Sequence, residues 1–315
     1  MPPSPPAHTA REFRQSGWDD HLARDGADLA RGWFAEDLGH ECDWTSVALV
    51  SAEAMAELDV VARKVGVIAG LKAAAIVARV ADDQLEWRPI VADGAVVDAG
   101  AVVARLYGPT RSVLTAERVV LNLLGRMSGV ATATRRLVDA VDGTGCRVYD
   151  TRKTVPGWRL LDKLAVRLGG GWNHRMGLYD AILIKDNHLA AAAEAGLRPD
   201  EAVKRARRFV AETFPRERAE ATVVEIEVDS LEQLASVLPA GPDVVLLDNM
   251  LPADLAQAVD LRSKVAPWVI LEASGGIRPE SVRLIAETGV DRVSTGWPTH
   301  DAPWLDVALD WSSGK

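Results

Sequence analysis

Cysteine is scarce in this chain of 315 residues, which contains only Cys42 and Cys146. The two thiols have no metal-ligand spacing and form no disulfide framework, so we expect a reducing compartment, the cytoplasm. No apolar run reaches the roughly 18 residues that a membrane helix needs. The first residues also lack the basic and apolar regions of a signal peptide. We therefore expect no membrane association, and a disordered tail over residues 1–20.

A dinucleotide fingerprint is missing too, because no Gly-x-Gly-x-x-Gly follows the first expected strand of the second half. The net charge of −9 argues against non-specific binding to nucleic acid. It leaves room for an anionic substrate, since a local basic cleft focuses its own field. Hydrophobic residues make up 48% and charged residues 26%, an ordinary globular balance. The length suits a barrel of about 200 to 250 residues with a smaller partner domain.

The first half of the chain predicts a small α+β domain on an antiparallel sheet. Short β-like runs separated by glycines alternate with helical stretches in this half. We expect strands over 47–50, 65–68, 96–97 and 102–106. We expect helices over 21–34, 52–63 and 71–81, and a long helical region over 113–141 that is interrupted near 125–129.

From residue 146 onward the pattern alternates between strands and helices, which predicts a parallel sheet with right-handed crossovers. The strands favour a barrel or near-barrel over an open sheet. The predicted strands cover 146–149, 181–184, 222–228, 244–247, 269–271 and 291–294, with helices between them over 158–168, 200–213, 230–237, 252–265 and 279–288. We divide the chain into a tail over 1–20, an α+β sandwich domain with its linking helix over 21–130, a barrel over 131–300 and a C-terminal helix over 301–315.

Polar residues follow each expected strand of the second half, where barrel enzymes place their active sites. The two most basic clusters are Arg152 with Lys153, and His174 with Arg175. Lys185 follows the next strand, so up to five cations meet at one place. Mutual repulsion of cations destabilises a fold unless a ligand offsets it, which indicates a substrate with several anionic groups.

Glycine turns follow the last two strands. Ser274, Gly275 and Gly276 come after one strand and precede a helix expected near Pro279, while Gly296 comes after the other. Glycine lets backbone N–H groups approach an anion, and a helix N-terminus adds its positive end. Because the last two loops of a barrel recurrently bind phosphate, we interpret this pair as a phosphate site.

Two carboxylates, Glu227 and Asp248, end adjacent strands beside the basic clusters. Such a pair holds Mg²⁺, grips sugar hydroxyls or neutralises the arginines. Glu225 lies two residues before Glu227, so the side chains of both point to the same face of the strand. Their spacing does not decide which of the two is functional. Lys185 is open to a second interpretation, a Schiff-base lysine whose pKa is lowered by neighbouring cations.

Three motifs together resemble the signature of the quinolinate phosphoribosyltransferase family. They are Thr-Arg-Lys-Thr-x-Pro-Gly at 151–157, Gly-Gly-Gly-x-Asn-His-Arg-x-Gly-Leu at 169–178 and Ile-Lys-Asp-Asn-His at 184–188. The similarity extends over nearly the whole chain. It implies an N-terminal open sandwich followed by an incomplete α/β barrel. It also implies transfer of phosphoribose from phosphoribosyl pyrophosphate to quinolinate, giving nicotinate mononucleotide, CO₂ and pyrophosphate with the help of Mg²⁺.

The resemblance also implies residue roles. The catalytic set that it implies is Lys153, Lys185, Glu227 and Asp248, with Glu227 and Asp248 as candidate Mg²⁺ contacts. The substrate-binding set is Arg118, Thr151, Arg152, Lys153, His174, Arg175, Lys185, Glu227, Asp248, Ser274, Gly275, Gly276, Ser294 and Gly296.

The resemblance further implies a homodimer with shared active sites, or a higher oligomer. Three rival functions remain: a related pyrophosphorylase-like protein of metal-uptake operons, a Schiff-base aldolase using Lys185, and a non-enzymatic sensor.

Overall fold

The computed structural model describes residues 11–194 and 196–312, which divide into two compact units. The sandwich unit comprises residues 16–135, 154–170 and 298–312, and the barrel unit comprises residues 11–15, 136–153 and 171–297. Each unit therefore collects segments that are far apart in the sequence. The expected division at residues 130 and 300 does not capture this, because 154–170 belongs to the sandwich unit.

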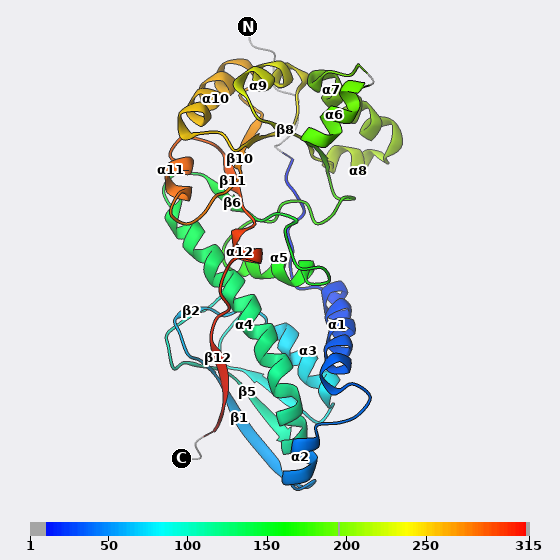
Figure 1. The fold of residues 1–315 in the computed structure, drawn as a ribbon, viewed down its shortest axis with the longest axis vertical. Helices are drawn as coiled ribbons and strands as arrows, with labels where there is room; N and C mark the ends of the chain where they lie inside the picture. Colours follow the sequence, from blue (N-terminus) through cyan, green and yellow to red (C-terminus); the bar gives the residue numbers. More distant parts are fainter. Residues whose placement is uncertain (1–10, 195, 313–315) are drawn as a thin grey trace. The chain divides into compact units, whose positions relative to one another are not determined.

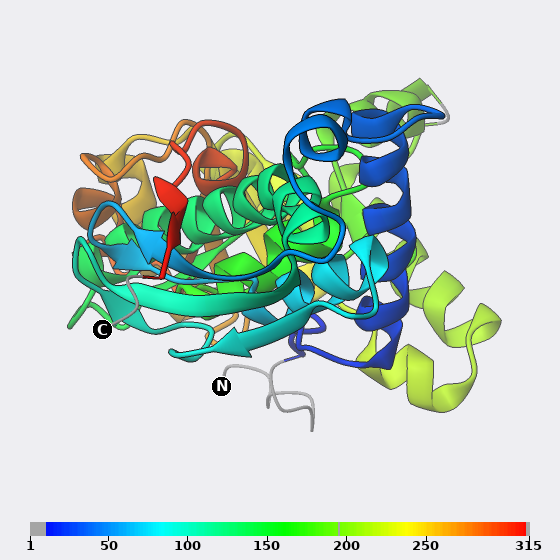
Figure 2. The ribbon, with the colours of Figure 1, turned by 90° about the horizontal axis from the view of Figure 1, so that it is seen from below.

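The sandwich unit is built on a four-stranded antiparallel sheet with the order β12-β1-β5-β3, beside a two-stranded sheet of β2 and β4. The helix α4 crosses one face of the larger sheet (Figure 2) and shares its apolar core. The elements are α1 (Asp20–Leu38), α2 (Trp44–Leu49), β1 (Met55–Ala62), β2 (Gly66–Val67), α3 (Leu71–Ala81), β3 (Glu86–Pro89), β4 (Val96–Val97), β5 (Val102–Pro109), α5 (Arg159–Leu168) and β12 (Val307–Trp311). Helices α4 (Thr110–Ala140) and α12 (Trp297–His300) belong partly to each unit.

Two sequence predictions in the first part of this unit are wrong in type. The expected helix over 52–63 is strand β1, which alternates buried with less buried residues and is paired on both sides, so tertiary pairing overrides local propensity. The expected strand over 47–50 is mostly helix α2. Its N-cap is Asp43, whose carboxylate accepts the Ser46 N–H at 3.0 Å.

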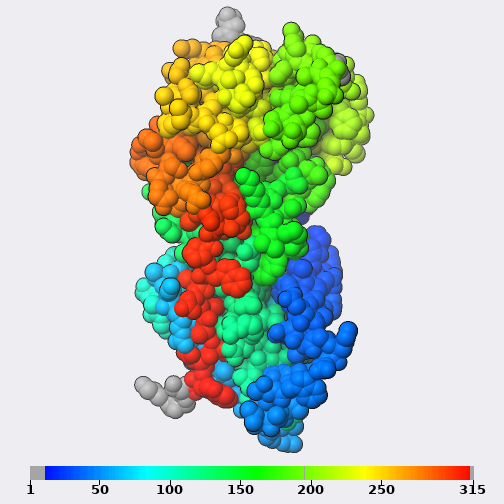
Figure 3. Space-filling model, in the orientation of Figure 1, coloured from blue at the N-terminus to red at the C-terminus, as the bar shows by residue number. Residues whose placement is uncertain are grey.

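The long helix α4 is continuous, whereas the sequence predicted an interruption near its glycines. Gly125 and Gly129 serve a close approach instead. A Cβ on Gly129 would lie 2.5 Å from the carbonyl oxygen of Pro303, and the N–H of Leu305 donates to the Gly125 carbonyl at 2.9 Å. The C-terminal segment thus lies along α4 (Figure 3) and continues into strand β12. The helix expected over 301–315 is therefore wrong for the described residues of that range.

The barrel unit contains six parallel strands in the order β6-β11-β10-β9-β8-β7, of which β6, β8, β10 and β11 are labelled in Figure 1. The strands β6 and β7 are the two edges, so the barrel is incomplete, as the sequence predicted. The elements are β6 (Arg147–Tyr149), β7 (Ile182–Ile184), α6 (Asp186–Glu194), α7 (Pro199–Thr213), α8 (Arg216–Ala221), β8 (Val224–Val228), α9 (Leu231–Val237), the 3₁₀ turn η1 (Leu238–Ala240), β9 (Val244–Asp248), α10 (Pro252–Val265), β10 (Ile270–Ser274), α11 (Val282–Ala286) and β11 (Arg292–Ser294).

The parallel strands carry different residues on their two faces. Their apolar outward residues pack with the helices into the main core of the unit, which includes Ile226, Leu247 and Leu271. A smaller apolar cluster contains Phe13, Tyr149 and Val244. Phe13 belongs to the segment expected to be a disordered tail. That expectation is wrong for residues 11–20, while residues 1–10 lie outside the described residues.

Among the described residues, no helix combines the length and the apolar character needed to cross a membrane.

Candidate active site

The carboxyl ends of the middle strands of the barrel unit lie at one level. The register pairs Ser274 of β10 with Asp248 of β9 on one side and with Ser294 of β11 on the other. Ser294 is in turn aligned with Tyr149, the last residue of β6. The sequence-predicted residues that follow these strands are therefore brought to a common edge, as the parallel arrangement requires.

The two glycine loops at this edge are tied together. The hydroxyl of Thr295, which precedes Gly296, donates to the carbonyl of Ile277 at 2.7 Å. Gly275 has φ +105°, and a Cβ there would lie 2.1 Å from Asn249 Oδ1. Only glycine fits this backbone. Helix α11 begins at Val282 and has five residues, rather than beginning near Pro279. An anion here would therefore be held by loop N–H groups, with little help from a helix dipole.

Two arginines of the predicted basic cluster come close together. Burial, and then the positive charge of Arg152, lower the pKa of Arg175. The Nε atoms of both guanidinium groups are buried and have no hydrogen-bond partner within the described chain. Nη1 of Arg175 makes one long contact, 3.5 Å from the Ala181 carbonyl. Lys153, by contrast, is exposed. The arginine pair is thus poised to bind an anion, because carboxylates match the guanidinium fork.

The segment carrying His174 and Arg175 is fixed to the edge of β6. Trp172 forms a parallel bridge with Tyr149, and its carbonyl accepts the Asp150 N–H at 3.0 Å. The buried carboxylate of Asp150 accepts the His174 N–H at 2.8 Å and the Asn173 side-chain amide at 2.7 Å. One buried aspartate at the end of β6 therefore orients the predicted histidine through its backbone.

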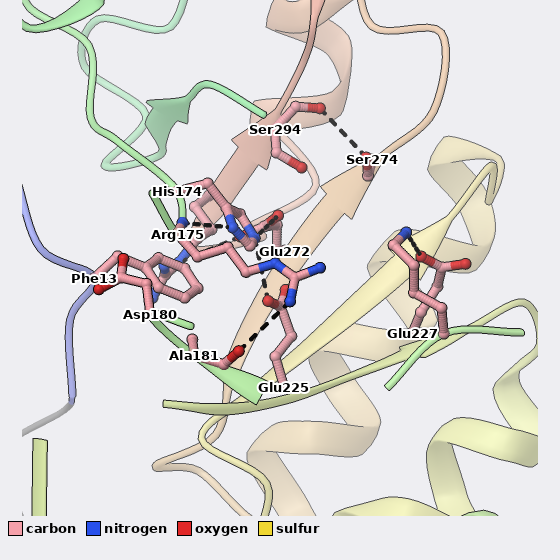
Figure 4. Close-up of polar contacts among 12 residues, drawn as sticks. Phe13, His174, Arg175, Asp180, Ala181, Glu225, Glu227, Glu272, Ser274 and Ser294 are labelled. Carbon is pink, nitrogen blue, oxygen red and sulfur yellow. Dashed lines mark hydrogen bonds and ion pairs between the residues drawn. The ribbon is translucent and has the colours of Figure 1, made fainter. Parts of the chain in front are cut away.

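The imidazole of His174 is buried, and two carboxylates lie next to its Nε2 atom (Figure 4). Nε2 lies 3.1 Å from Glu225 Oε2 and 3.4 Å from Glu272 Oε1. The backbone N–H of Arg175 points at Nδ1 from 2.8 Å, a contact that favours the neutral ring with its proton on Nε2, whereas the two carboxylates at Nε2 favour the charged ring. Burial by itself would lower the pKa of His174, but Glu225 and Glu272 outweigh it and raise that pKa to about 10.

The same cluster shifts its acids in opposite directions. Burial raises the pKa of Glu225. Burial also acts to raise the pKa of Glu272, but His174 and Arg292 hold it below its usual value. Arg292 Nε lies 3.8 Å from Glu272 Oε2. The ligand atoms of His174, Glu225 and Glu272 lie within 4.8 Å of one another, as in a metal site, but the buried Arg292 already supplies a positive charge there.

Glu227 has a different partner from Glu225. Its Oε2 lies 2.5 Å from Lys185 Nζ, and the lysine side chain is 43% exposed. The lysine is thus engaged in an ion pair, whereas a Schiff-base lysine must present its amine to a carbonyl substrate. This contact disfavours the aldolase interpretation of Lys185. Asp248, on the next strand, accepts a hydrogen bond from the Asn249 side chain at 2.9 Å.

Arg118 lies in the sandwich unit, apart in the chain from the other candidates. It is exposed on α4 and lines a cavity of about 430 Å³ with Trp33, Asn122, Arg126 and Trp158. Within that unit Trp33 stacks on Trp158, with ring centroids 5.0 Å apart.

Sequence reasoning did not select several residues around His174 as site residues. Glu272 is not among the predicted site residues, and residues 11–15 lie within the expected tail. The sequence does indicate a role for Arg292. It lies in a strand that is expected to be buried, and a buried charge needs a partner of opposite charge. Nothing in the sequence signalled Phe13 or Gln15, since their contacts lie more than a hundred residues away along the chain.

Comparison with known proteins agrees with this geometry. The family models for the quinolinate phosphoribosyl transferase C-terminal and N-terminal domains match residues 130–310 and 43–128. The nicotinate-nucleotide pyrophosphorylase [carboxylating] of Mycobacterium leprae is 42% identical over 285 residues, which are 90% of this chain and 96% of that protein. The chain belongs to the quinolinate phosphoribosyltransferase family.

Other members of the quinolinate phosphoribosyltransferase family are similar along the same length. The quinolinate phosphoribosyltransferase [decarboxylating] 2b of Nicotiana tabacum is 33% identical, covering 92% of this chain and 83% of that protein. The solved structure of the nicotinate-nucleotide pyrophosphorylase from Francisella tularensis superposes with a TM-score of 0.85 at 34% identity, covering 95% of this chain and 99% of that one. The similarity thus includes both units of the family fold.

Proposed function

We propose that this protein transfers the phosphoribosyl group of phosphoribosyl pyrophosphate to quinolinate and releases CO₂ and pyrophosphate, giving nicotinate mononucleotide for NAD biosynthesis. The observation that carries the proposal is the pair Arg152 and Arg175, whose buried Nε donors have no hydrogen-bond partner within the described chain. Quinolinate has two carboxylates, and each guanidinium fork suits one carboxylate.

The acidic residues at the strand ends fit the sugar. Loss of pyrophosphate leaves an oxocarbenium-like ribose centre, which a nearby carboxylate stabilises electrostatically. Glu227 and Asp248, on the adjacent strands β8 and β9, are the candidates for this role. Lys185 is held by Glu227 and supplies a positive charge for the leaving group or for a substrate carboxylate.

The phosphate of the ribose fits the glycine loops. Gly275, Gly276 and Gly296 follow β10 and β11, and Thr295 ties the two loops together. In this arrangement the substrate spans from the loops to the arginines. Decarboxylation then requires stabilisation of negative charge on the pyridine ring beside its positive nitrogen, and no protein nucleophile is needed.

Magnesium is proposed as a partner of phosphoribosyl pyrophosphate. Mg²⁺ keeps several waters and is commonly held by one or two carboxylates and the substrate phosphates. Glu227 and Asp248 fit that donor set, and the ion would neutralise charge on the departing pyrophosphate. Because Glu227 already forms an ion pair with Lys185, we propose Asp248 as the more available of the two ligands for Mg²⁺.

A homodimer with shared active sites is also proposed. The support is Arg118, a predicted substrate-binding residue that belongs to the sandwich unit, whereas the other candidates belong to the barrel unit. Mixing Arg118→Ala subunits with Lys185→Ala subunits tests this directly. If each site uses residues from two chains, mixed dimers regain about a quarter to a half of wild-type activity. No recovery after subunit exchange would refute the sharing.

The cytoplasm is proposed as the location, since Cys42 and Cys146 are both free. The activity itself is tested by incubating the protein with quinolinate, phosphoribosyl pyrophosphate and Mg²⁺ and detecting CO₂ and nicotinate mononucleotide. Absence of both products, with the folded protein verified by circular dichroism, would refute the proposed function. Excess chelator should abolish turnover, and full turnover in chelator would refute the role of Mg²⁺.

A further inference from the structure

We infer that Phe13 and Gln15 are positioning residues of the active site, which fix segment 172–175 and thereby orient His174 and Arg175. The inference rests on the proposed function for the meaning of the site. It goes beyond that function because it assigns a role to residues 11–15, a segment that precedes both family domains in the sequence.

Gln15 binds segment 172–175 as a neighbouring strand would. Its Oε1 accepts the Asn173 N–H at 2.8 Å, and its Nε2 donates to the Asn173 carbonyl at 3.0 Å. Asn173 is fully buried. On its other side the segment is held by β6 and by Asp150. The side chain of Gln15 therefore satisfies backbone groups that a closed barrel would have paired with another strand.

Phe13 fixes the ring of His174. The two rings stack with centroids 4.2 Å apart and planes at 26°, and Phe13 is 4% exposed. Figure 4 shows Phe13 on one side of the imidazole and the carboxylates of Glu225 and Glu272 on the other. Because Nδ1 is occupied by the Arg175 N–H, ring stacking and the carboxylates leave the imidazole one orientation.

Residues 11 and 12 anchor the segment independently. Glu12 accepts the hydroxyl of Tyr149 at 2.6 Å, and its other oxygen lies 3.4 Å from Arg292 Nη1. Arg11 pairs with Asp243 at 3.3 Å. A change at Phe13 or Gln15 alone leaves these anchors in place. The segment as a whole therefore stays in place, and the contacts that are lost are those of Phe13 with His174, Tyr149 and Arg292 or those of Gln15 with Asn173.

A positioning role has a kinetic signature that simple stabilisation lacks. Arg175 faces the dicarboxylate in the proposed function, and His174 precedes it in the same buried segment, whereas the ribose phosphate is assigned to the glycine loops. Misplacement of His174 and Arg175 should raise KM for quinolinate and lower kcat. It should leave KM for phosphoribosyl pyrophosphate within about twofold of wild type, because the phosphate loops after β10 and β11 are held by their own contacts.

The experiment compares the full-length variants Phe13→Leu, Gln15→Ala and Gln15→Glu with wild type in steady-state assays of both substrates. We expect kcat/KM for quinolinate to fall about tenfold to a hundredfold for Phe13→Leu and Gln15→Ala. Gln15→Glu should be at least as damaging as Gln15→Ala, because it keeps the acceptor for the Asn173 N–H but sets a carboxylate oxygen against the carbonyls of Asn173 and Phe13.

Phe214→Leu is the matched control. Phe214 also packs in the barrel unit beneath an arginine, with Arg218 4.1 Å from its ring centroid, just as Arg292 lies 5.5 Å from the ring of Phe13. It should lower the melting temperature without changing either KM. The inference is overturned if Phe13→Leu and Gln15→Ala raise KM equally for both substrates. It is also overturned if they lower only the melting temperature, as the control does.

Failure of the proposed function gives a different result, because wild type then forms no nicotinate mononucleotide. In that case quinolinate binding is measured by titration calorimetry. Weaker binding in Phe13→Leu and Gln15→Ala than in wild type and Phe214→Leu supports the positioning role. Equal binding, or no binding by wild type, overturns it.

Discussion

Glu225 and Glu227 leave the same strand two residues apart, yet one pairs with a histidine and the other with a lysine. Glu225 is fully buried and lies 3.1 Å from His174 Nε2, whereas Glu227 is 2.5 Å from the half-exposed Lys185 Nζ. Sequence spacing put both carboxylates on one side of the strand and could not choose between them. The structure separates a fully buried carboxylate that pairs with the histidine from a less buried one that pairs with a partly exposed lysine.

This separation predicts that the Lys185–Glu227 pair matters for activity and little for stability. An ion pair with solvent access contributes about 0.2–1 kcal/mol, so Lys185→Gln and Glu227→Gln should each shift the free energy of unfolding by no more than that. Each should lower kcat/KM by about a hundredfold or more, as loss of electrostatic stabilisation does elsewhere. Urea denaturation and steady-state assays measure the two quantities.

Borohydride trapping completes this test. The wild-type protein should form no reduced adduct at Lys185 with candidate carbonyl substrates, since its ammonium is paired. A trapped adduct mapped to Lys185 by mass spectrometry would favour the aldolase instead.

The arginine pair predicts a strong preference for quinolinate over nicotinate. Nicotinate lacks one carboxylate and leaves a guanidinium unpaired, which costs about 3–5 kcal/mol for a buried charge. That corresponds to about a hundredfold or more in relative kcat/KM. Arg152→Ala and Arg175→Ala should each reduce both the activity and this preference. Arg216→Ala, whose side chain is 91% exposed, should change neither. Comparable kcat/KM values for quinolinate and nicotinate in wild type would contradict the assignment of Arg152 and Arg175 to a dicarboxylate substrate.

The buried histidine predicts a loss of stability as the pH rises. The pKa of His174 is about 10 in the folded protein against 6.5 as its ordinary value. A raised folded pKa stabilises the fold fully below pH 6.5 and less and less as the pH approaches 10. The free energy of unfolding of wild type should therefore fall across this window, whereas that of His174→Gln should fall less. Parallel curves in urea denaturation at pH 6 to 10 would contradict the assignment.

The approach of the C-terminal segment to α4 predicts a sharp difference between two glycines. Gly129→Ala would place a Cβ 2.5 Å from the Pro303 carbonyl and should destabilise the protein by about 1–3 kcal/mol. Gly32 lies in α1, where an added Cβ would meet nothing within 4 Å, so Gly32→Ala should stabilise by up to about 1 kcal/mol. Thermal and urea unfolding distinguish the two, and a neutral Gly129→Ala would show that the helix and the segment separate easily.

Residues that follow parallel strands were predictable, because strand periodicity and the rule that such ends share one edge act locally and repeatedly. Asp248, Ser274 and Ser294 lie level for that reason. Helices and strands whose type depends on pairing with distant parts of the chain were not predictable. Strand β1 has a locally helical pattern, and β12 was expected as helix, because only the pairing between them selects extended backbone. The same limit hid Phe13, whose partner His174 lies far along the chain.

Strand β12 closes a sheet whose other members were made long before it. It pairs with β1, while residues 110 to 306 intervene between β5 and β12. During synthesis at about 5–20 residues per second, β1 must wait many seconds with one edge open. An open edge invites pairing with other chains, so nascent or C-terminally clipped protein should depend on chaperones more than the finished chain does. Strand β12 thus completes the sheet of the sandwich unit only after β6 to β11 of the barrel unit have been synthesised.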